Sequence, residues 1–220
     1  MILLGLEFSS ARRSAAVLSP VGTSSAEAWS QGESGTDAMA LIERALHVAG
    51  LAPEAVEGIV VGLGPGSYAG VRSAIALAQG WRLARGVRLA GVSSVLAAAA
   101  EAQRQGCRGV IHVAVDAQRE EAYLGTFELT EQSCIEKAPL RLTGMEPVRL
   151  LAREGQAVMG PGVSLWCPCA RDLWPTGSRL VEMVAKDGSH QHADDLEPIY
   201  LREVRFVKSV SAFQAGTRAG

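Results

Sequence analysis

The sequence lacks the features of several common protein classes. Its 220 residues include only four cysteines, too few for a disulfide framework in a chain of this length. The formal net charge of −2 gives no net attraction to polyanions, so charge does not favour independent binding of a nucleic acid. The apolar run at residues 1–6 ends at Glu7 and predicts neither a signal peptide nor a membrane span. We therefore expect a cytoplasmic protein that has no membrane segment.

Patterns that ligate metals are also sparse. Cys167 and Cys169 are separated by one residue, whereas structural zinc sites usually space their cysteines by two residues and add a second pair. His190 and His192 lack the spacing that places two ligands on one face of a helix. The sequence therefore predicts no metal site in this chain.

Apolar residues, by contrast, make up 48% of the chain, enough to build a sizeable core. In the most informative stretch, a β-branched run at residues 58–61 predicts a buried strand, and residues 71–85 predict a helix. The tight turn that joins them is rich in glycine: it contains Gly64, Pro65, Gly66, Ser67 and Gly70.

A glycine-rich turn between a strand and a helix can bind phosphate through its backbone N–H groups. However, the third glycine, Gly70, lies one residue too late for a dinucleotide-binding fingerprint. A Walker loop needs a lysine, and none precedes Lys137. We therefore favour a structural role, in which Ser67 caps the helix and the glycines allow close backbone contact.

Small residues form two rows on this helix. Gly70, Ala74 and Ala78 form one row, and the other is formed by Ser73, Ala76 and Gly80. Because small side chains let helices approach closely, we expect the helix to pack on two sides. We assign the first row to the protein's own sheet and the second to a partner. The helix predicted at residues 38–49 has a wide apolar stripe, and its contribution to the same interface would be Leu41, Ala45 and Val48.

Periodicity and capping residues predict the remaining elements. Further strands are expected at residues 15–19, 24–29, 87–91 and 156–159, and further helices at 94–105, 147–153 and 179–185. Asp37 is the expected N-cap of the helix at residues 38–49.

The two halves of the chain begin alike, which indicates a duplication. In the first half an apolar strand ends in Glu7, and in the second half one ends in Asp116. In both halves a polar turn and a returning strand follow. This predicts an N-terminal lobe at residues 1–106 and a C-terminal lobe at 107–220, with a tail from about residue 209 that frays. The two acids either face each other across a cleft, as magnesium ligands or a base, or are ordinary acids at strand ends.

Several blocks of the sequence resemble the TsaB (YeaZ) family of tRNA threonylcarbamoyladenosine (t6A) biosynthesis proteins. The most specific block runs from Gly64 through Arg72 to Ser73 and is followed by a Gly-Val-Ser-Ser segment at residues 91–94. Residues 198–202 are similar to the terminal motif of that family. The resemblance implies an α/β protein with the two-lobed actin-like or Hsp70-like (ASKHA) fold and duplicated ribonuclease-H-like lobes.

The same resemblance implies a non-catalytic assembly subunit that is not itself an enzyme. It would form a heterodimer with the catalytic paralogue TsaD and work with the ATPase TsaE. The first-lobe helices would form the contact, and a homodimer through the same helices is a further possibility. This chain alone would bind no cofactor, because ATP and metal are expected on the partner subunits, and it would reach tRNA only through the complex. Glu7 and Asp116 would be vestigial acids of the cleft.

The sequence departs from the family at the first hairpin. The family usually has an aspartate at the position of Glu7, followed by Thr-Ser-Thr where this chain has Phe8, Ser9 and Ser10. The alternative function is an independent ATP-dependent small-molecule kinase of the same fold. Hairpin turns without glycine argue against it, because a phosphate cradle needs small residues there. A peptidase is a third possibility, but the sequence offers no credible metal ligands for one.

Overall fold

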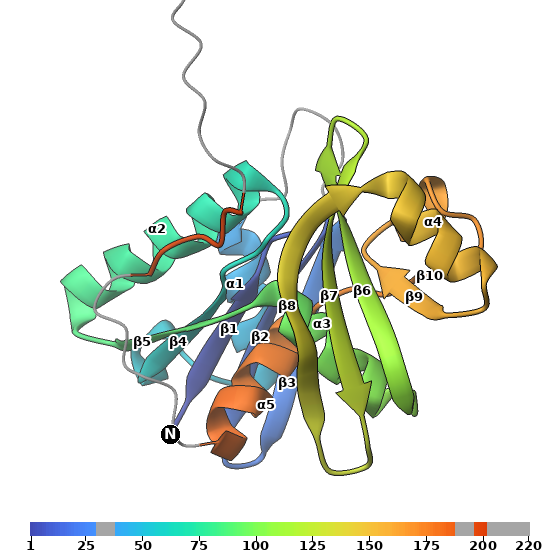
Figure 1. Ribbon diagram of the computed structural model, residues 1–220. Coiled ribbons are helices and arrows are strands. Elements are labelled where there is room, and N and C mark those ends of the chain that lie inside the picture. The colour runs from blue at the N-terminus through green and yellow to red at the C-terminus, as the bar shows by residue number, and fades with distance from the viewer. Residues whose placement is uncertain (30–37, 188–195, 202–220) are drawn as a thin grey trace, which may run out of the picture.

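The computed structural model describes residues 1–29, 38–187 and 196–201, which form two lobes (Figure 1). The five strands of the first lobe are β1 (Leu3–Glu7), β2 (Arg12–Ser19), β3 (Gly22–Trp29), β4 (Gly58–Gly62) and β5 (Arg88–Val92). They form one sheet in the order β3-β2-β1-β4-β5, in which β1 pairs antiparallel with β2 and parallel with β4.

The sheet of the second lobe repeats this topology. Its strands are β6 (Gly109–Gln118), β7 (Glu121–Leu129), β8 (Cys134–Gly144), β9 (Ala157–Gly160) and β10 (Arg171–Asp172). Their order, β8-β7-β6-β9-β10, is that of the first sheet, and β6 again pairs antiparallel with β7 and parallel with β9. The duplication and the two-lobed actin-like fold predicted from the sequence are therefore confirmed.

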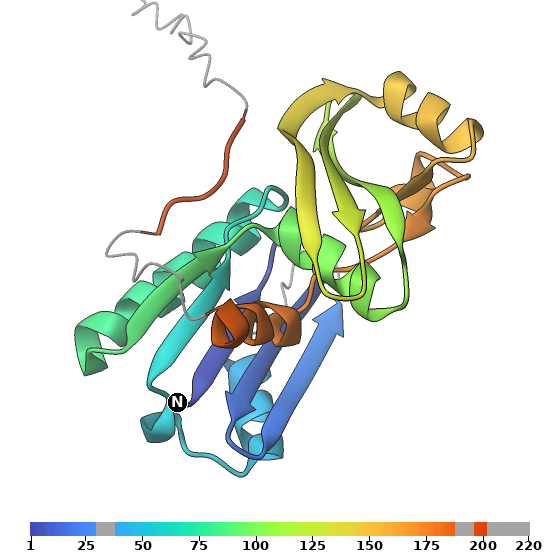
Figure 2. The same cartoon turned by 60° about the horizontal axis from the view of Figure 1, so that its bottom comes forward.

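Helices cover both sheets on both faces. They are α1 (Ala38–Ala49), α2 (Tyr68–Arg85), α3 (Ser94–Arg104), α4 (Met145–Arg153) and α5 (Gly177–Asp187), together with the short 3₁₀ helices η1 (Pro53–Ala55) and η2 (Val163–Leu165). The first sheet lies between α1 and α2 on one face and α5 on the other (Figures 1 and 2). Helix α2 connects β4 to β5, and the equivalent connection of the second lobe, from β9 to β10, contains only the short η2. A long helix in this connection is therefore found in the first lobe alone.

The central strand β1 is buried along its whole length because helices cover both faces of its sheet. Leu4 and Leu6 point into the core shared with α1 and α2. Leu3 points to the opposite face, where it joins the cluster that contains Leu180 of α5. A continuous apolar strand of this kind is what a sheet covered on both faces requires.

The two lobes exchange their last helices. Helix α3, from the first half of the chain, packs on the second sheet through Val95 and Ala98. Helix α5, from the second half, packs on the first sheet through Leu180, and Leu196 also joins the core of the first lobe. The predicted range 107–220 for the second lobe is therefore too wide, because the chain returns to the first lobe at α5.

The glycine-rich turn is packed tightly against the first hairpin. A Cβ atom at Gly66 would come within 2.1 Å of the Ser9 carbonyl oxygen, and one at Gly70 would come within 2.0 Å of the Phe8 carbonyl oxygen. The Ser67 N–H donates to the Ser9 carbonyl at 2.7 Å, and the Ser67 hydroxyl accepts from the Gly70 N–H as the N-cap of α2. The structural role predicted for this turn is confirmed.

The two rows on α2 face different surroundings. Gly70, Ala74 and Ala78 are buried against the sheet, as predicted. The expectation for α1 is wrong in part: Leu41 and Ala45 are buried in the lobe's own core and cannot reach a partner. Both lie on the same side of α1 as Ile42 and Leu46, which are also buried, so four of the apolar positions serve the core.

Two strands were not predicted, β8 and the two-residue β10. Strand β8 is an edge strand that contains Pro139 and is largely exposed, so its sequence carries little apolar periodicity. Several expectations fall outside the described residues: Asp37 as a helix cap, the histidines at 190 and 192, Arg202 of the terminal motif and the tail from residue 209.

Two glycines of α2 provide a matched test of this packing. We expect Gly70→Ala to lower the free energy of unfolding by about 2–3 kcal/mol or more, because its new Cβ meets a backbone oxygen. A Cβ at Gly80 meets nothing within 4 Å, so Gly80→Ala should be neutral or stabilise the helix by up to about 1 kcal/mol. Urea unfolding of both variants measures the difference. Equal effects would show that Gly70 is not tightly packed.

Candidate functional site

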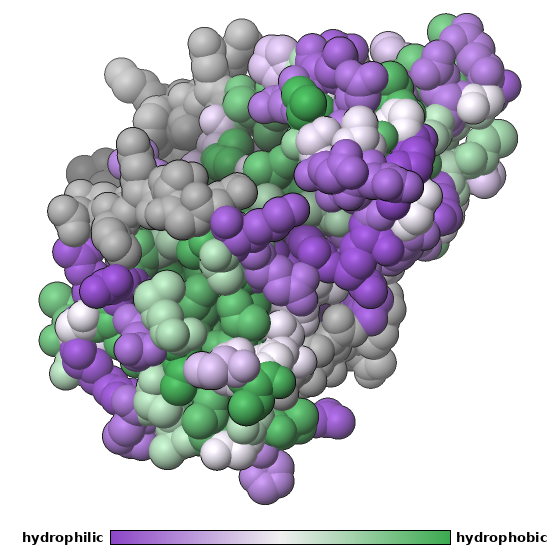
Figure 3. All heavy atoms as spheres, turned by 90° about the horizontal axis from the view of Figure 1, so that it is seen from below, coloured by the Kyte–Doolittle hydropathy of each residue, from purple (hydrophilic) through white to green (hydrophobic). Residues whose placement is uncertain are grey.

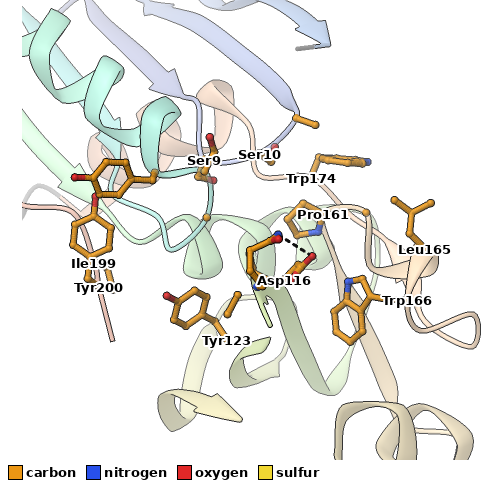
Figure 4. A pocket seen from close by; sticks show the side chains of 18 residues that line it. Ser9, Ser10, Asp116, Tyr123, Pro161, Leu165, Trp166, Trp174, Ile199 and Tyr200 are labelled. Carbon is orange, nitrogen blue, oxygen red and sulfur yellow. Dashed lines mark hydrogen bonds between the residues drawn. The ribbon is translucent and has the colours of Figure 1, made fainter. Parts of the chain in front are cut away.

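A cleft of about 830 Å³ lies between the two lobes. Its walls come from segments that are far apart in the sequence: the first hairpin turn at Ser9 and Ser10, the start of α2, the end of β6, the turn at Pro161 and the C-terminal residues Ile199 and Tyr200. Figure 4 shows these groups converging on Asp116. The duplicated topology therefore brings the ends of both first hairpins to one site, as the sequence comparison of the two halves predicted.

Aromatic side chains are enriched in the cleft: they make up five of its 18 lining residues but only 5% of the chain. They are Tyr68, Tyr123, Trp166, Trp174 and Tyr200. The rings of Tyr68 and Tyr200 stack with their centroids 5.6 Å apart. Figure 4 places Tyr123 and Tyr200 on one side of Asp116 and the two tryptophans on the other. The sequence analysis did not identify this aromatic lining, since its members lie on segments separated by up to about 130 residues.

Asp116 stabilises the turn that follows it. Its Oδ1 atom accepts the backbone N–H of Gln118 at 2.6 Å, and its Oδ2 atom accepts from the Gln118 side chain at 3.2 Å. Residues 118–120 all have φ near +60°, a conformation that L-residues rarely adopt in succession. The carboxylate therefore holds a strained turn in place while it also borders the cleft.

Glu7, the acid expected opposite Asp116, does not line the cleft. Its side chain is fully buried beneath the glycine-rich turn. Oε1 accepts the Ser9 N–H at 2.8 Å, and Oε2 accepts the Ser94 hydroxyl at 2.7 Å. The interpretation of Glu7 as an acid of the cleft is therefore wrong. The residue does end β1, as the alternative expected, but it is buried and does not lie on the surface.

The contacts of Glu7 join three segments of the first lobe. The Ser94 hydroxyl, which donates to Glu7, also accepts the Gly64 N–H at 3.1 Å. A Cβ at Gly62 would come within 2.0 Å of Glu7 Oε2, so only glycine leaves room for the carboxyl group. Burial raises the pKa of Glu7, and its hydrogen bonds to Ser9 and Ser94 offset part of that increase.

The second row of α2 is open to solvent. Ala76 and Gly80 are exposed and Ser73 is half-buried, while Leu83 near the end of the helix is 90% exposed. The guanidinium of Arg72 lies over the ring of Tyr68, 4.9 Å from its centroid, at the start of the same exposed face. Val48 of α1 is also exposed. The α2 residues form a face of small and apolar side chains that the described part of the chain leaves uncovered.

A smaller hollow lies on the first lobe beside α5. It encloses about 30 Å³ between Met1, Leu3 and Val184, room for no more than about one or two water molecules. Figure 3 shows hydrophobic residues gathered over the first lobe on this side, whereas hydrophilic residues predominate over the second lobe. The interlobe cleft is therefore the better candidate for a ligand site.

The described residues also bear on metal sites and membrane spans. Within residues 1–29, 38–187 and 196–201, no three histidine, cysteine or acidic side chains are grouped as they would be around a metal ion. The helices in the same ranges include none with the length and hydropathy needed to span a bilayer.

Comparison with known proteins gives consistent matches. A family model described as "TsaD: tRNA N6-adenosine threonylcarbamoyltransferase" matches residues 33–148, more than half of the chain. The tRNA threonylcarbamoyladenosine biosynthesis protein TsaB of Escherichia coli K12 is 24% identical over 184 residues, covering 74% of this chain and 78% of its own length.

Two solved structures from Pseudomonas aeruginosa share the fold. One is described as an uncharacterized protein with similarity to peptidase YEAZ; it has 26% identity and a TM-score of 0.76. The other is YeaZ, with 24% identity and a TM-score of 0.74. Each comparison covers 91% of this chain and 99% of the other. The resemblance to TsaB (YeaZ) inferred from the glycine-turn motif is confirmed.

The raised pKa of Glu7 predicts how stability depends on pH. Between its ordinary value of 4.5 and the raised value, the folded state keeps a proton that the unfolded state has released, so stability falls as pH rises. We expect Glu7→Gln to remove this component, because the amide carries no charge and its oxygen still accepts from Ser9. Thermal unfolding from about pH 5 to about pH 8 should show a smaller loss of Tm in the variant than in the wild type.

The control is Glu43→Gln on the exposed surface of α1, which should leave the pH profile unchanged. If the profiles of Glu7→Gln and the wild type run parallel, burial of the Glu7 carboxyl does not penalise its charge.

Proposed function

Since the chain belongs to the TsaD family, described as tRNA N6-adenosine threonylcarbamoyltransferase, we propose that it acts in t6A biosynthesis as a non-catalytic subunit of a larger complex. In this proposal it forms a heterodimer with the catalytic TsaD paralogue of its own organism and works with TsaE. ATP and metal are bound by those partners, and tRNA is reached only through the complex.

The observation that carries this proposal is the uncovered face of α2. The helix is packed against the sheet through one row of small residues, and it presents the second row, Ala76 and Gly80 with Ser73 beside them, to solvent. A solvent-facing helix of a monomer usually carries long polar side chains on that face. Small side chains there allow another helix to approach to a short interaxial distance.

The composition of this face also suits a partner. Leu83 is almost fully exposed near the C-terminal end of the helix, and burying such a side chain contributes about 1.5–3 kcal/mol to association. Val48 of α1 adds exposed apolar surface. Leu41 and Ala45 make no direct contact with a partner in this proposal, because they are buried between α1 and the rest of the lobe. The proposed interface is therefore centred on α2 rather than shared equally between both helices.

A non-catalytic role is supported by how the first hairpin is used. The Phe8 and Ser9 carbonyl oxygens fill the space beside Gly66 and Gly70, where a phosphate cradle would need free N–H groups. Glu7, at the position of the expected acid, is hydrogen-bonded and enclosed. Both features indicate that the first hairpin packs within the lobe and does not bind phosphate. They therefore favour a non-catalytic subunit over an ATP-dependent kinase.

Loss of the gene tests the proposed function directly. We expect deletion in the native host to abolish or sharply lower t6A in bulk tRNA, because a subunit required for complex assembly cannot be bypassed. Nucleoside mass spectrometry measures the modified adenosine, and expression of the wild-type chain should restore it. An unchanged t6A level in a host without a second gene copy would contradict the proposal.

Two alanines on opposite faces of α2 test the interface. Ala76→Trp should keep Tm within about 2–3 °C of the wild type, since the site is exposed, but should prevent co-purification with the TsaD paralogue. Ala74→Trp should destabilise the fold by about 1–3 kcal/mol or more, because Ala74 is fully buried.

Co-expression followed by affinity purification gives the first measurement, and thermal unfolding gives the second. If Ala76→Trp still retains the paralogue, the face is not the heterodimer contact. Sedimentation of the isolated wild type then shows whether the same face instead joins two copies of this chain.

A further inference from the structure

The interlobe cleft has properties that the proposed assembly role does not use. It lies between the lobes and meets the exposed face of α2 only at Tyr68, and its volume of about 830 Å³ falls within the usual range for sites that bind small molecules. Both lobes contribute aromatic rings to it: Tyr68 from the first, and Tyr123, Trp166 and Trp174 from the second. Aromatic rings on opposite sides of a cleft suit a flat ligand, because the rings can stack against its faces.

The charge of the lining narrows the chemistry of that ligand. Among the described residues that border the cleft, Asp116 is the one charged side chain, and none is lysine or arginine. Within this described lining, a triphosphate or another strong anion would meet the Asp116 carboxylate and no cationic side chain; Arg72 lies over the ring of Tyr68 and is not part of the lining. Hydroxyl and amino groups, in contrast, can donate to the carboxylate oxygens of Asp116, and Ser9 and Ser10 offer further polar atoms.

The tryptophan side of the cleft also offers a donor. The indole nitrogen of Trp166 is buried, and it finds no acceptor among the residues that the structure describes. Figure 4 shows this nitrogen on the side of the ring that faces Pro161 and Leu165, both of which line the cleft. A buried N–H without a partner costs about 1–3 kcal/mol, and an acceptor on a ligand would remove that cost.

We propose that the cleft binds a free nucleoside without phosphate groups. The base stacks on the aromatic walls and accepts a hydrogen bond from Trp166, and the ribose hydroxyls donate to Asp116. Stacking on an aromatic side chain is worth about 1–3 kcal/mol per base, so affinity does not require phosphate contacts. Since both lobes form the walls, the bound nucleoside contacts both and holds them at a fixed separation.

Calorimetric titration of the full-length protein tests this inference with adenosine as the probe. We expect one adenosine per chain, with binding at least about tenfold tighter than that of ATP with or without magnesium, because the triphosphate meets Asp116. Glucose serves as a ligand that has hydroxyls but no flat ring, and it should not bind. Tryptophan fluorescence should change on adenosine addition because two of the four tryptophans line the cleft.

Three cleft variants locate the site, and a fourth variant outside the cleft serves as the control. Trp174→Leu removes a stacking surface, and Trp166→Phe removes the N–H donor. Asp116→Asn removes the charge while keeping an acceptor for the Gln118 N–H. Each variant should lower the affinity for adenosine at least about tenfold. Trp81→Phe, on α2 and away from the cleft, should bind adenosine like the wild type. Thermal unfolding identifies any variant that fails to fold. The affinities of the folded variants then show whether adenosine binds in the cleft.

Absence of adenosine binding at millimolar concentration would overturn the proposal, and so would ATP binding as tight as adenosine. Unchanged affinity in the folded cleft variants, or equal binding of glucose, would also overturn it. The proposed assembly role is tested separately, since the cleft variants should still co-purify with the TsaD paralogue whichever result the titration gives.

Discussion

The first lobe depends on the enclosure of one carboxyl group. Glu7 stands at the end of the central strand and is hydrogen-bonded to the first hairpin turn and, through Ser94, to the backbone of the glycine-rich turn at Gly64. The turn can reach this position only because Gly66 and Gly70 bring its backbone against two carbonyl oxygens of the hairpin. Strand β1, the start of α2 and the start of α3 are therefore fixed relative to one another by one small polar cluster. The direction of α2, and hence the face that it presents to solvent, follows from that cluster.

Much of the fold could be predicted from the sequence because the periodic elements carry local information. Apolar runs locate β1 and β4, Ser67 caps α2 as expected, and the repeated strand-acid-turn pattern reveals the duplication. Strand β8 was missed for a physical reason: an exposed edge strand needs few apolar residues and tolerates Pro139. The assignment of Leu41 and Ala45 of α1 to an interface was wrong because both are buried in the core. Periodicity reveals an apolar stripe on a helix, but it does not show which residues of the stripe are buried.

The site was harder to predict than the fold because its parts meet only in three dimensions. Sequence reasoning found Asp116, which borders the cleft, and expected Glu7 beside it, but a buried acid and an acid at a cleft look alike as the last residue of a strand. The aromatic lining gave a weaker signal still, since tyrosine and tryptophan are ordinary core residues. Two tryptophans within the irregular stretch at residues 166–174 were the available hint, and their significance appears only when Tyr123 and Tyr200 are placed opposite them.

The exchanged helices show how the duplicated halves are related. Helix α3 leaves the first half to cover the second sheet, and α5 leaves the second half to cover the first. Arg179 of α5 lies 3.6 Å from the buried carboxylate of Glu101 on α3, so the two exchanged helices also meet each other. One half alone would expose an entire apolar face of its sheet, which only a second half can cover. The single chain thus has the architecture of a domain-swapped dimer whose two subunits have been joined end to end. The interlobe cleft then corresponds to the junction between the two subunits of such a dimer.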